Sequence, residues 1–150
     1  MNKTEYMLTV LAEECGEIIL EDLNENSKIE DFNQEMIDLV SIYEMLEERK
    51  ILNIPYKIDL KTINSRRELS LAINRLQHLI FKSLRFGLNH NHPKTNVLNK
   101  TEIENQLDLI IYNFPNFVKL DQMIIEEKKA EKKAKVIRFF KLSKEQGRLR

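Results

Sequence analysis

Apolar residues recur every three or four positions along most of this chain, which is the spacing of a buried helix face. One such stripe occupies residues 4–23, a second follows Ser27, and others run over 65–86 and from Thr101 onward. In the first stripe the apolar positions are Met7, Leu11, Cys15, Ile18 and Leu23. The pattern predicts four amphipathic helices and a last helix over about 118–147.

Three capping boxes mark predicted helix starts. Ser27, Ser65 and Thr101 each precede a glutamate by three residues, an arrangement that satisfies the first free N–H groups of a helix. Pro115 is expected to end the fourth helix, because a proline has no N–H to donate and disfavours helix in the residue before it.

The predicted helices form two hairpins, residues 4–48 and 65–114, followed by a long basic helix. A lone hairpin would leave its apolar stripe in water, so the two hairpins are expected to pack together. The expected fold is all-α: a four-helix bundle of two hairpins plus the C-terminal helix, in one domain over residues 1–150. The length of 150 residues suits one domain, and 3 Gly and 3 Pro without alternating apolar runs argue against an all-β fold.

The net charge of zero conceals an uneven distribution of charge. Residues 1–48 carry 14 acidic and 2 basic side chains, whereas residues 128–150 carry 10 basic and 2 acidic. The two ends can attract each other, or together hold a metal ion and a polyanion; a solvated basic helix face is the alternative. Neither a membrane-spanning stretch nor a signal peptide is evident, so a cytoplasmic protein without a membrane partner is expected.

Four carboxylates stand at helical spacing in the acidic first hairpin. Glu14 and Glu17 are three residues apart in one helix, and Glu35 and Asp38 repeat that spacing in the next. Each pair lies beside an apolar stripe, so the hairpin can bring all four together at the edge of the core. Converging carboxylates repel one another unless a cation joins them, and such oxygen ligands suit Mg²⁺ or Mn²⁺. The alternative is ordinary acidic pairs on a solvated helix face.

A family resemblance appears at these same residues. The segments EECGE (13–17) and EMID (35–38) resemble the EExxE and ExxD signature of the MazG-like all-α nucleoside triphosphate pyrophosphohydrolases. Segments 82–87, 132–136 and 141–149 resemble phage-type members. The resemblance implies hydrolysis of a (deoxy)nucleoside triphosphate to the monophosphate and pyrophosphate in nucleotide-pool housekeeping. It assigns Mg²⁺ to Glu14, Glu17, Glu35 and Asp38, and assigns Glu13 to orienting or deprotonating the attacking water.

The order of the motifs departs from simple phage-type members, in which a Leu-Arg-Phe-Gly segment directly follows the first acidic helix. Here that segment follows the whole acidic signature. An internal duplication would explain this order, with 71–114 as a second hairpin. In that hairpin 105–108 would match ExxD with its glutamate replaced by Asn105, and Leu71, Ala72 and Arg75 would occupy the EExxE positions. The chain would then be a pseudo-dimeric monomer or pair again as a homo-oligomer. Lys82 and Arg85 of the second hairpin would contact substrate phosphates, or else simply end a helix.

Two other functions compete with this one. The basic C-terminal helix suits nucleic acid, but its aromatic residues Phe139 and Phe140 look core-facing and the acidic hairpin would repel DNA, which argues against that partner. The other is a catalytically inactive helical bundle that acts as a nucleotide-, nucleic-acid- or protein-binding regulator. The chain has no GxxxxGK[ST] loop, so phosphate recognition must use a metal and side chains.

Overall fold

The computed structural model describes residues 1–53 and 60–149, and these residues form helices and loops without a β-strand. Within them the helices are α1 (Lys3–Leu23), α2 (Ile29–Glu48), α3 (Arg66–Phe86), α4 (Asn99–Phe117) and α5 (Gln122–Glu145). The all-α prediction is therefore confirmed. In the described ranges, no helix has the length and apolar character that crossing a membrane requires.

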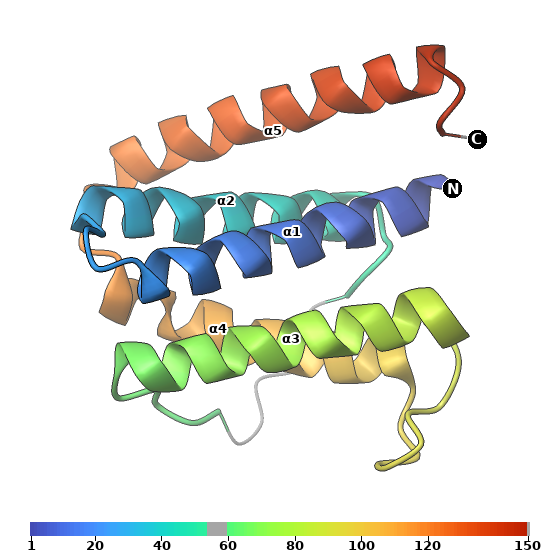
Figure 1. Ribbon diagram of the computed structural model, residues 1–150, viewed down its shortest axis with the longest axis horizontal. Coiled ribbons are helices and arrows are strands. Elements are labelled where there is room, and N and C mark those ends of the chain that lie inside the picture. Colours follow the sequence, from blue (N-terminus) through green and yellow to red (C-terminus); the bar gives the residue numbers. More distant parts are fainter. Residues whose placement is uncertain (54–59, 150) are drawn as a thin grey trace.

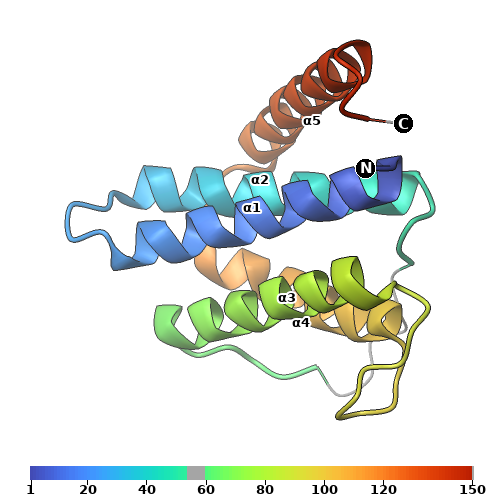
Figure 2. The same ribbon diagram turned by 45° about the vertical axis from the view of Figure 1, so that its right-hand side comes forward.

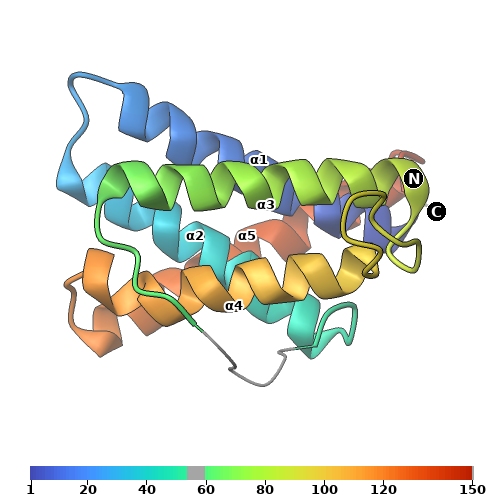
Figure 3. The same ribbon diagram turned by 90° about the horizontal axis from the view of Figure 1, so that it is seen from below.

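The helices are arranged in three layers. α1 and α2 lie side by side in the middle, α3 and α4 cover one side, and α5 lies on the other (Figures 1 and 2). Seen from below, α3 and α4 stand in front of α1 and α2 (Figure 3). α5 packs against α2, whereas α1 packs against α2 and α3. The acidic first hairpin is thus covered on one face by the second hairpin and on the other by the basic helix.

The core is formed by the predicted stripes. Met7, Leu11, Cys15 and Ile18 of α1 are fully buried, and burial raises the pKa of the Cys15 thiol, as expected for a packed core residue. Leu23 departs from the prediction: it is the last residue of α1 and is 74% exposed. The apolar spacing therefore identifies the buried face of α1 but does not show at which residue that face becomes exposed.

One of the three predicted capping boxes is found. Ser65 is the N-cap of α3, and its hydroxyl accepts a hydrogen bond from the Glu68 N–H at 3.1 Å. The Glu68 carboxylate accepts from the N–H of Asn64, one residue earlier than the ideal box requires, at 2.9 Å. At the other end of α3, Gly87 adopts a positive φ of 101° that favours glycine.

The other two capping predictions are wrong. α2 has Lys28 at its N-cap without a side-chain hydrogen bond, and the Ser27 hydroxyl is buried without a partner in the described residues. α4 begins two residues before Thr101, and the Glu104 carboxylate accepts a hydrogen bond from the Asn53 N–H instead. In both cases the helix begins at a residue that the capping-box motif does not indicate.

Two predicted ends of helices also need correction. Pro115 lies inside α4, which continues to Phe117, because a proline in the last turn removes only one N–H and the N–H of Val118 still bonds the Phe114 carbonyl at 3.0 Å. The last helix is shorter than 118–147. It begins after Asp121, whose carboxylate caps the N–H of Met123 at 2.8 Å.

Candidate metal centre

Four carboxylates converge where α1 lies beside α2. Glu14 and Glu17 come from α1, and Glu35 and Asp38 come from α2; each offers one oxygen, and these four oxygens lie within 4.8 Å of one another. Residues three apart on a helix occupy neighbouring turns of one face, which is why two pairs suffice to form the cluster. The predicted convergence is confirmed. Within residues 1–53 and 60–149, no other group of three or more potential metal ligands is found.

The cluster is partly withdrawn from water. Glu14 is 3% exposed and Asp38 is 8% exposed, whereas Glu17 is exposed. Burial, reinforced by the neighbouring carboxylates, raises the pKa of Glu14 to about 7 and that of Glu35 to about 8. Burial also raises the pKa of Asp38, although the hydrogen bond from Gln34 lowers it. Without a cation, the cluster therefore resists full ionisation near neutral pH.

Two oxygens of the cluster have unmet bonding capacity. Oε2 of Glu14 and Oε2 of Glu35 are buried and have no hydrogen-bond partner in the described part of the chain. Buried polar atoms in proteins are almost always hydrogen-bonded, so these two oxygens require an explanation. A divalent cation would satisfy both, and a donor set made only of carboxylate oxygens fits Mg²⁺ or Mn²⁺. The residues present thus fit the expected metal.

A lysine from α5 reaches into the same cluster. The Lys132 ammonium lies 2.7 Å from Oε1 of Glu14 and 3.9 Å from Oδ2 of Asp38, and its side chain is 15% exposed. Burial alone would lower the pKa of Lys132, but the hydrogen bond and charge of Glu14 raise it. No sequence motif assigned Lys132 to the site. The sequence feature that could have indicated this contact is the attraction expected between the acidic and basic ends of the chain.

Further ion pairs hold α5 against α2. The Lys129 ammonium lies 2.7 Å from Glu44, and the Lys133 ammonium lies 2.9 Å from Glu44 and 3.1 Å from Glu48. These two lysines lower the pKa of Glu44 against the effect of burial, which would raise it. One face of the basic helix is therefore engaged with the acidic hairpin, and the expectation that the two ends attract each other is confirmed.

Glu13 lies at the edge of the cluster. Its side chain is exposed and lines a pocket of about 540 Å³ between α1 and α5, together with Glu14 and Glu17. The four clustered oxygens do not include one from Glu13. Its carboxylate is thus available for a role other than ligation, which is the role that the resemblance implies.

Lys82 and Arg85 lie elsewhere. Both are on α3, where the Lys82 ammonium and the Arg85 guanidinium lie 5.7 Å and 4.9 Å from the centre of the Phe86 ring. α3 covers the face of α1 and α2 that is opposite α5 (Figure 1), and neither residue lines the pocket beside the carboxylates. Their assignment to substrate phosphates stays a prediction. The cations that line this pocket are Lys132, Lys135 and Arg148.

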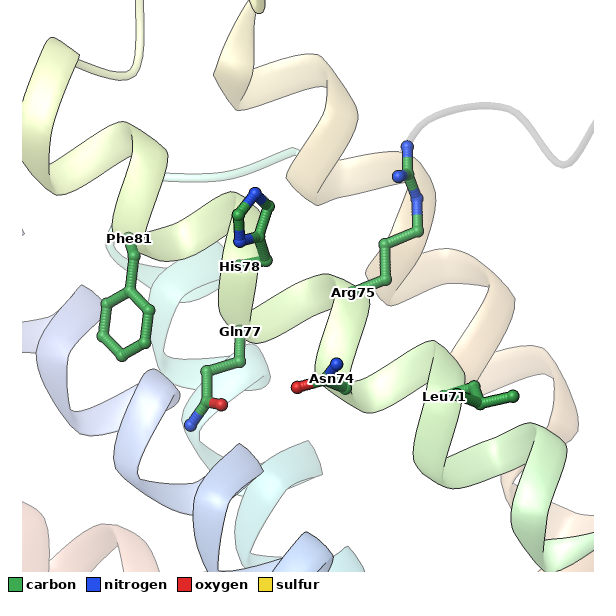
Figure 4. A pocket seen from close by; sticks show the side chains of 6 residues that line it. All are labelled: Leu71, Asn74, Arg75, Gln77, His78 and Phe81. Carbon is green, nitrogen blue, oxygen red and sulfur yellow. The ribbon is translucent and has the colours of Figure 1, made fainter.

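A separate pocket of about 420 Å³ is lined by α3 alone (Figure 4). Gln77 points toward α1 and donates to the Ala12 carbonyl at 3.0 Å, and Arg75 pairs with Glu102 at 3.4 Å. No carboxylate lines this pocket. Leu71 and Arg75 stand where a duplicated hairpin would need acidic residues, so α3 offers no second site of the α1–α2 type.

Comparisons with known proteins do not place the chain in a family. No protein-family model, curated protein or solved structure matches it. Any account of function therefore depends on the carboxylate cluster, on the lysines that face it and on the pocket beside it.

Proposed function

We propose that this protein is a Mg²⁺-dependent pyrophosphohydrolase of the MazG-like type, which converts a (deoxy)nucleoside triphosphate to the monophosphate and pyrophosphate. Nucleotide-pool housekeeping in the cytoplasm is the proposed role. The observation that carries the proposal is the convergence of four carboxylates, two of which have a buried oxygen without a partner. Such a cluster is costly without a bound cation, and a cation held there can bind a polyphosphate.

In the proposed architecture, α1 to α4 constitute a four-helix bundle of two hairpins, and α5 packs outside this bundle as a basic helix. Only the first hairpin keeps the acidic residues, so the chain acts as a pseudo-dimeric monomer with one site. The contacts of α1 with α3 and of α2 with α4 join the two hairpins and support this arrangement.

Different residues of this chain have different roles in the proposed reaction. Glu14, Glu17, Glu35 and Asp38 hold the metal, for which Mn²⁺ can substitute. Bound Mg²⁺ supplies neutralisation of the charge that develops on the phosphate oxygens. Glu13 orients a water molecule and accepts its proton as that water adds across the α–β phosphoanhydride bond. Cleavage of this bond releases the monophosphate and pyrophosphate.

The experiment is an analysis of products. Pyrophosphate and orthophosphate are measured separately after incubation with canonical and modified (deoxy)nucleoside triphosphates in Mg²⁺, in Mn²⁺ or in chelator. Metal-dependent release of pyrophosphate from at least one substrate is expected. Release of orthophosphate alone would assign cleavage to a different bond, and no release from any substrate would contradict the proposed activity.

One observation favours a second candidate, a catalytically inactive bundle that binds a nucleotide or partner as a regulator. Lys132 already brings a positive charge to within 2.7 Å of Glu14, so the cluster could be a permanent ion-pair network without a metal. Calorimetry with Mg²⁺ separates the two candidates. Saturable binding supports the metal centre, whereas absence of binding together with absence of pyrophosphate release supports the inactive bundle.

A further inference from the structure

The pocket beside the carboxylates is a cleft between two antiparallel helices. α5 packs against α2 rather than against α1 (Figure 1). Side-chain contacts nevertheless join α5 to α1: the Lys132 ammonium lies 2.7 Å from Glu14, and the ring of Phe140 stands edge-on to the ring of Tyr6, with 5.4 Å between ring centres. Side chains of both helices line the cleft, whose volume is about 540 Å³.

The cleft changes in character along its length. Glu14 and Lys132 mark a charged end, where Glu13, Glu17 and Lys135 also line it. Tyr6 marks the other end, where Phe139 and Leu142 supply apolar surface and Ser143, Gln146 and Arg148 supply hydrogen-bonding groups. At the rise of an α-helix, the eight steps along the chain from Tyr6 to Glu14 span about 12 Å.

A ligand that complements this cleft has two dissimilar ends. One end is a polyanion, because a cation on the carboxylates and the two nearby lysines all attract negative charge. The other end is a flat apolar group with polar edges, because it meets aromatic surface together with amide, hydroxyl and guanidinium groups. A nucleoside triphosphate has this composition.

Phe139 is the aromatic residue suited to stacking. It lines the cleft and is 47% exposed, which is a large exposure for a phenylalanine. Phe140 is occupied differently: besides its contact with Tyr6, the cations of Lys3 and Arg49 lie 5.8 Å and 5.6 Å from its ring centre. Phe140 therefore fixes α5 in place, whereas the Phe139 ring is left to a ligand.

We propose that α5 is the substrate-recognition helix, with Lys132 and Lys135 contacting the polyphosphate and Phe139 stacking on the nucleobase. The inference rests on the proposed function and deepens it, because it assigns recognition to the basic helix rather than to Lys82 and Arg85. Base selectivity then depends on Ser143, Gln146 and Arg148 at the apolar end of the cleft.

The test compares two probes that differ only at the nucleoside. Calorimetry in Mg²⁺ measures the Kd of inorganic tripolyphosphate and of the α,β-methylene analogues of the four common deoxynucleoside triphosphates, which resist cleavage. Phe139→Ala and Lys135→Ala alter the cleft. Their matched controls are Ile137→Ala and Lys141→Ala, which change an apolar and a basic residue in a separate groove on α5. Circular dichroism verifies that each variant keeps its helical content.

The two ends of the cleft predict different patterns. Phe139→Ala weakens the tightest-bound analogue about tenfold, the magnitude of one base stacked on an aromatic ring, and leaves tripolyphosphate binding unchanged. Lys135→Ala weakens both probes about fivefold, as loss of one charged phosphate contact should. The two control variants bind both probes as the wild type does. Equal effects of Phe139→Ala and Ile137→Ala, or equal affinity for analogue and tripolyphosphate, would overturn the proposal.

Failure of this inference is distinguishable from failure of the proposed function. Mg²⁺ alone is titrated first into the wild type and into Glu14→Gln. If Glu14→Gln abolishes Mg²⁺ binding while Phe139→Ala leaves analogue binding unchanged, the metal centre stands and the role of α5 is overturned. If the wild type binds neither Mg²⁺ nor any analogue, both proposals are overturned.

Discussion

The ammonium of Lys132 lies 2.7 Å from the Glu14 carboxylate, so α5 reaches the acidic cluster that α1 and α2 form. A cation that binds this cluster must compete with that ammonium or displace it. The contact therefore connects the docking of α5 to the occupancy of the candidate metal centre.

Removing the competing lysine should strengthen metal binding. In Lys132→Met the carboxylates lose an internal positive charge, and we expect Mg²⁺ to bind about tenfold more tightly, equivalent to about 1.4 kcal/mol. Calorimetry measures the change. Lys133→Met is the control, because Lys133 pairs with Glu44 and Glu48 outside the cluster. Unchanged or weaker Mg²⁺ binding in Lys132→Met would argue against competition at this site.

Loss of one clustered carboxylate should abolish metal binding without unfolding the protein. Glu14→Gln and Asp38→Asn each remove a negative charge from the cluster at nearly constant volume. We expect no Mg²⁺ binding by calorimetry in either variant and unchanged helical content by circular dichroism. Glu30→Gln, an exposed residue of α2 outside the cluster, should bind Mg²⁺ as the wild type does. Normal binding in Glu14→Gln would remove this residue from the ligand set.

The protein without metal should become less stable as the pH rises from about 5 to about 8. The pKa values of Glu14 and Glu35 lie at about 7 and about 8 in the fold, above the ordinary value of 4.5, so the folded state holds more protons in this range. The free energy of unfolding therefore falls with rising pH. Glu44, whose pKa is lowered, contributes below this range.

Urea unfolding in chelator measures this dependence. The midpoint should decrease across the range, and the decrease should be smaller in Glu14→Gln because one of the responsible carboxyls is gone. Saturating Mg²⁺ should oppose the decrease, since it stabilises the ionised cluster. A midpoint that increases with pH in chelator would contradict the assigned pKa directions.

A buried amide in α4 should be important for stability. Asn113 is fully buried; its side-chain oxygen accepts from the Ile63 N–H at 2.8 Å and its amide donates to the carbonyls of Lys61 and Leu109, each at 2.9 Å. Asn113→Ala would leave the Ile63 N–H and the Lys61 carbonyl without these partners, and we expect a loss of about 3 kcal/mol. Chemical unfolding measures it. Asn116→Ala, at an exposed position of the same helix, should change stability little.

The helical spacing predicted much of this structure because burial is read directly from periodicity. Met7, Leu11, Cys15 and Ile18 are buried as their spacing indicates, and the same spacing places Glu14 and Glu17 beside that face. Two pairs of carboxylates on adjacent helices then had to meet at one edge. These features follow from helix geometry within a single hairpin.

Contacts between helices that are distant in the sequence could not be predicted from the apolar periodicity. An apolar stripe shows which face of α5 is buried but not which helix covers it, so the partners of Lys132 and the cleft at Phe139 were not foreseen. The local motifs at Ser27 and Thr101 were also misleading: α2 and α4 begin at other residues, and the Glu104 carboxylate accepts from the distant Asn53 N–H instead of capping its own helix. Phe139 was expected in the core, yet it is 47% exposed.

We propose that the acidic cluster binds the metal of a pyrophosphate-releasing enzyme. The most direct measurement is the rate of pyrophosphate release from the (deoxy)nucleoside triphosphate panel by wild type and Glu14→Gln, each with Mg²⁺ and with chelator. We expect the wild type to release pyrophosphate in Mg²⁺, and we expect no release in the other three conditions. Release that persists in chelator, or that Glu14→Gln retains in full, would contradict this proposal.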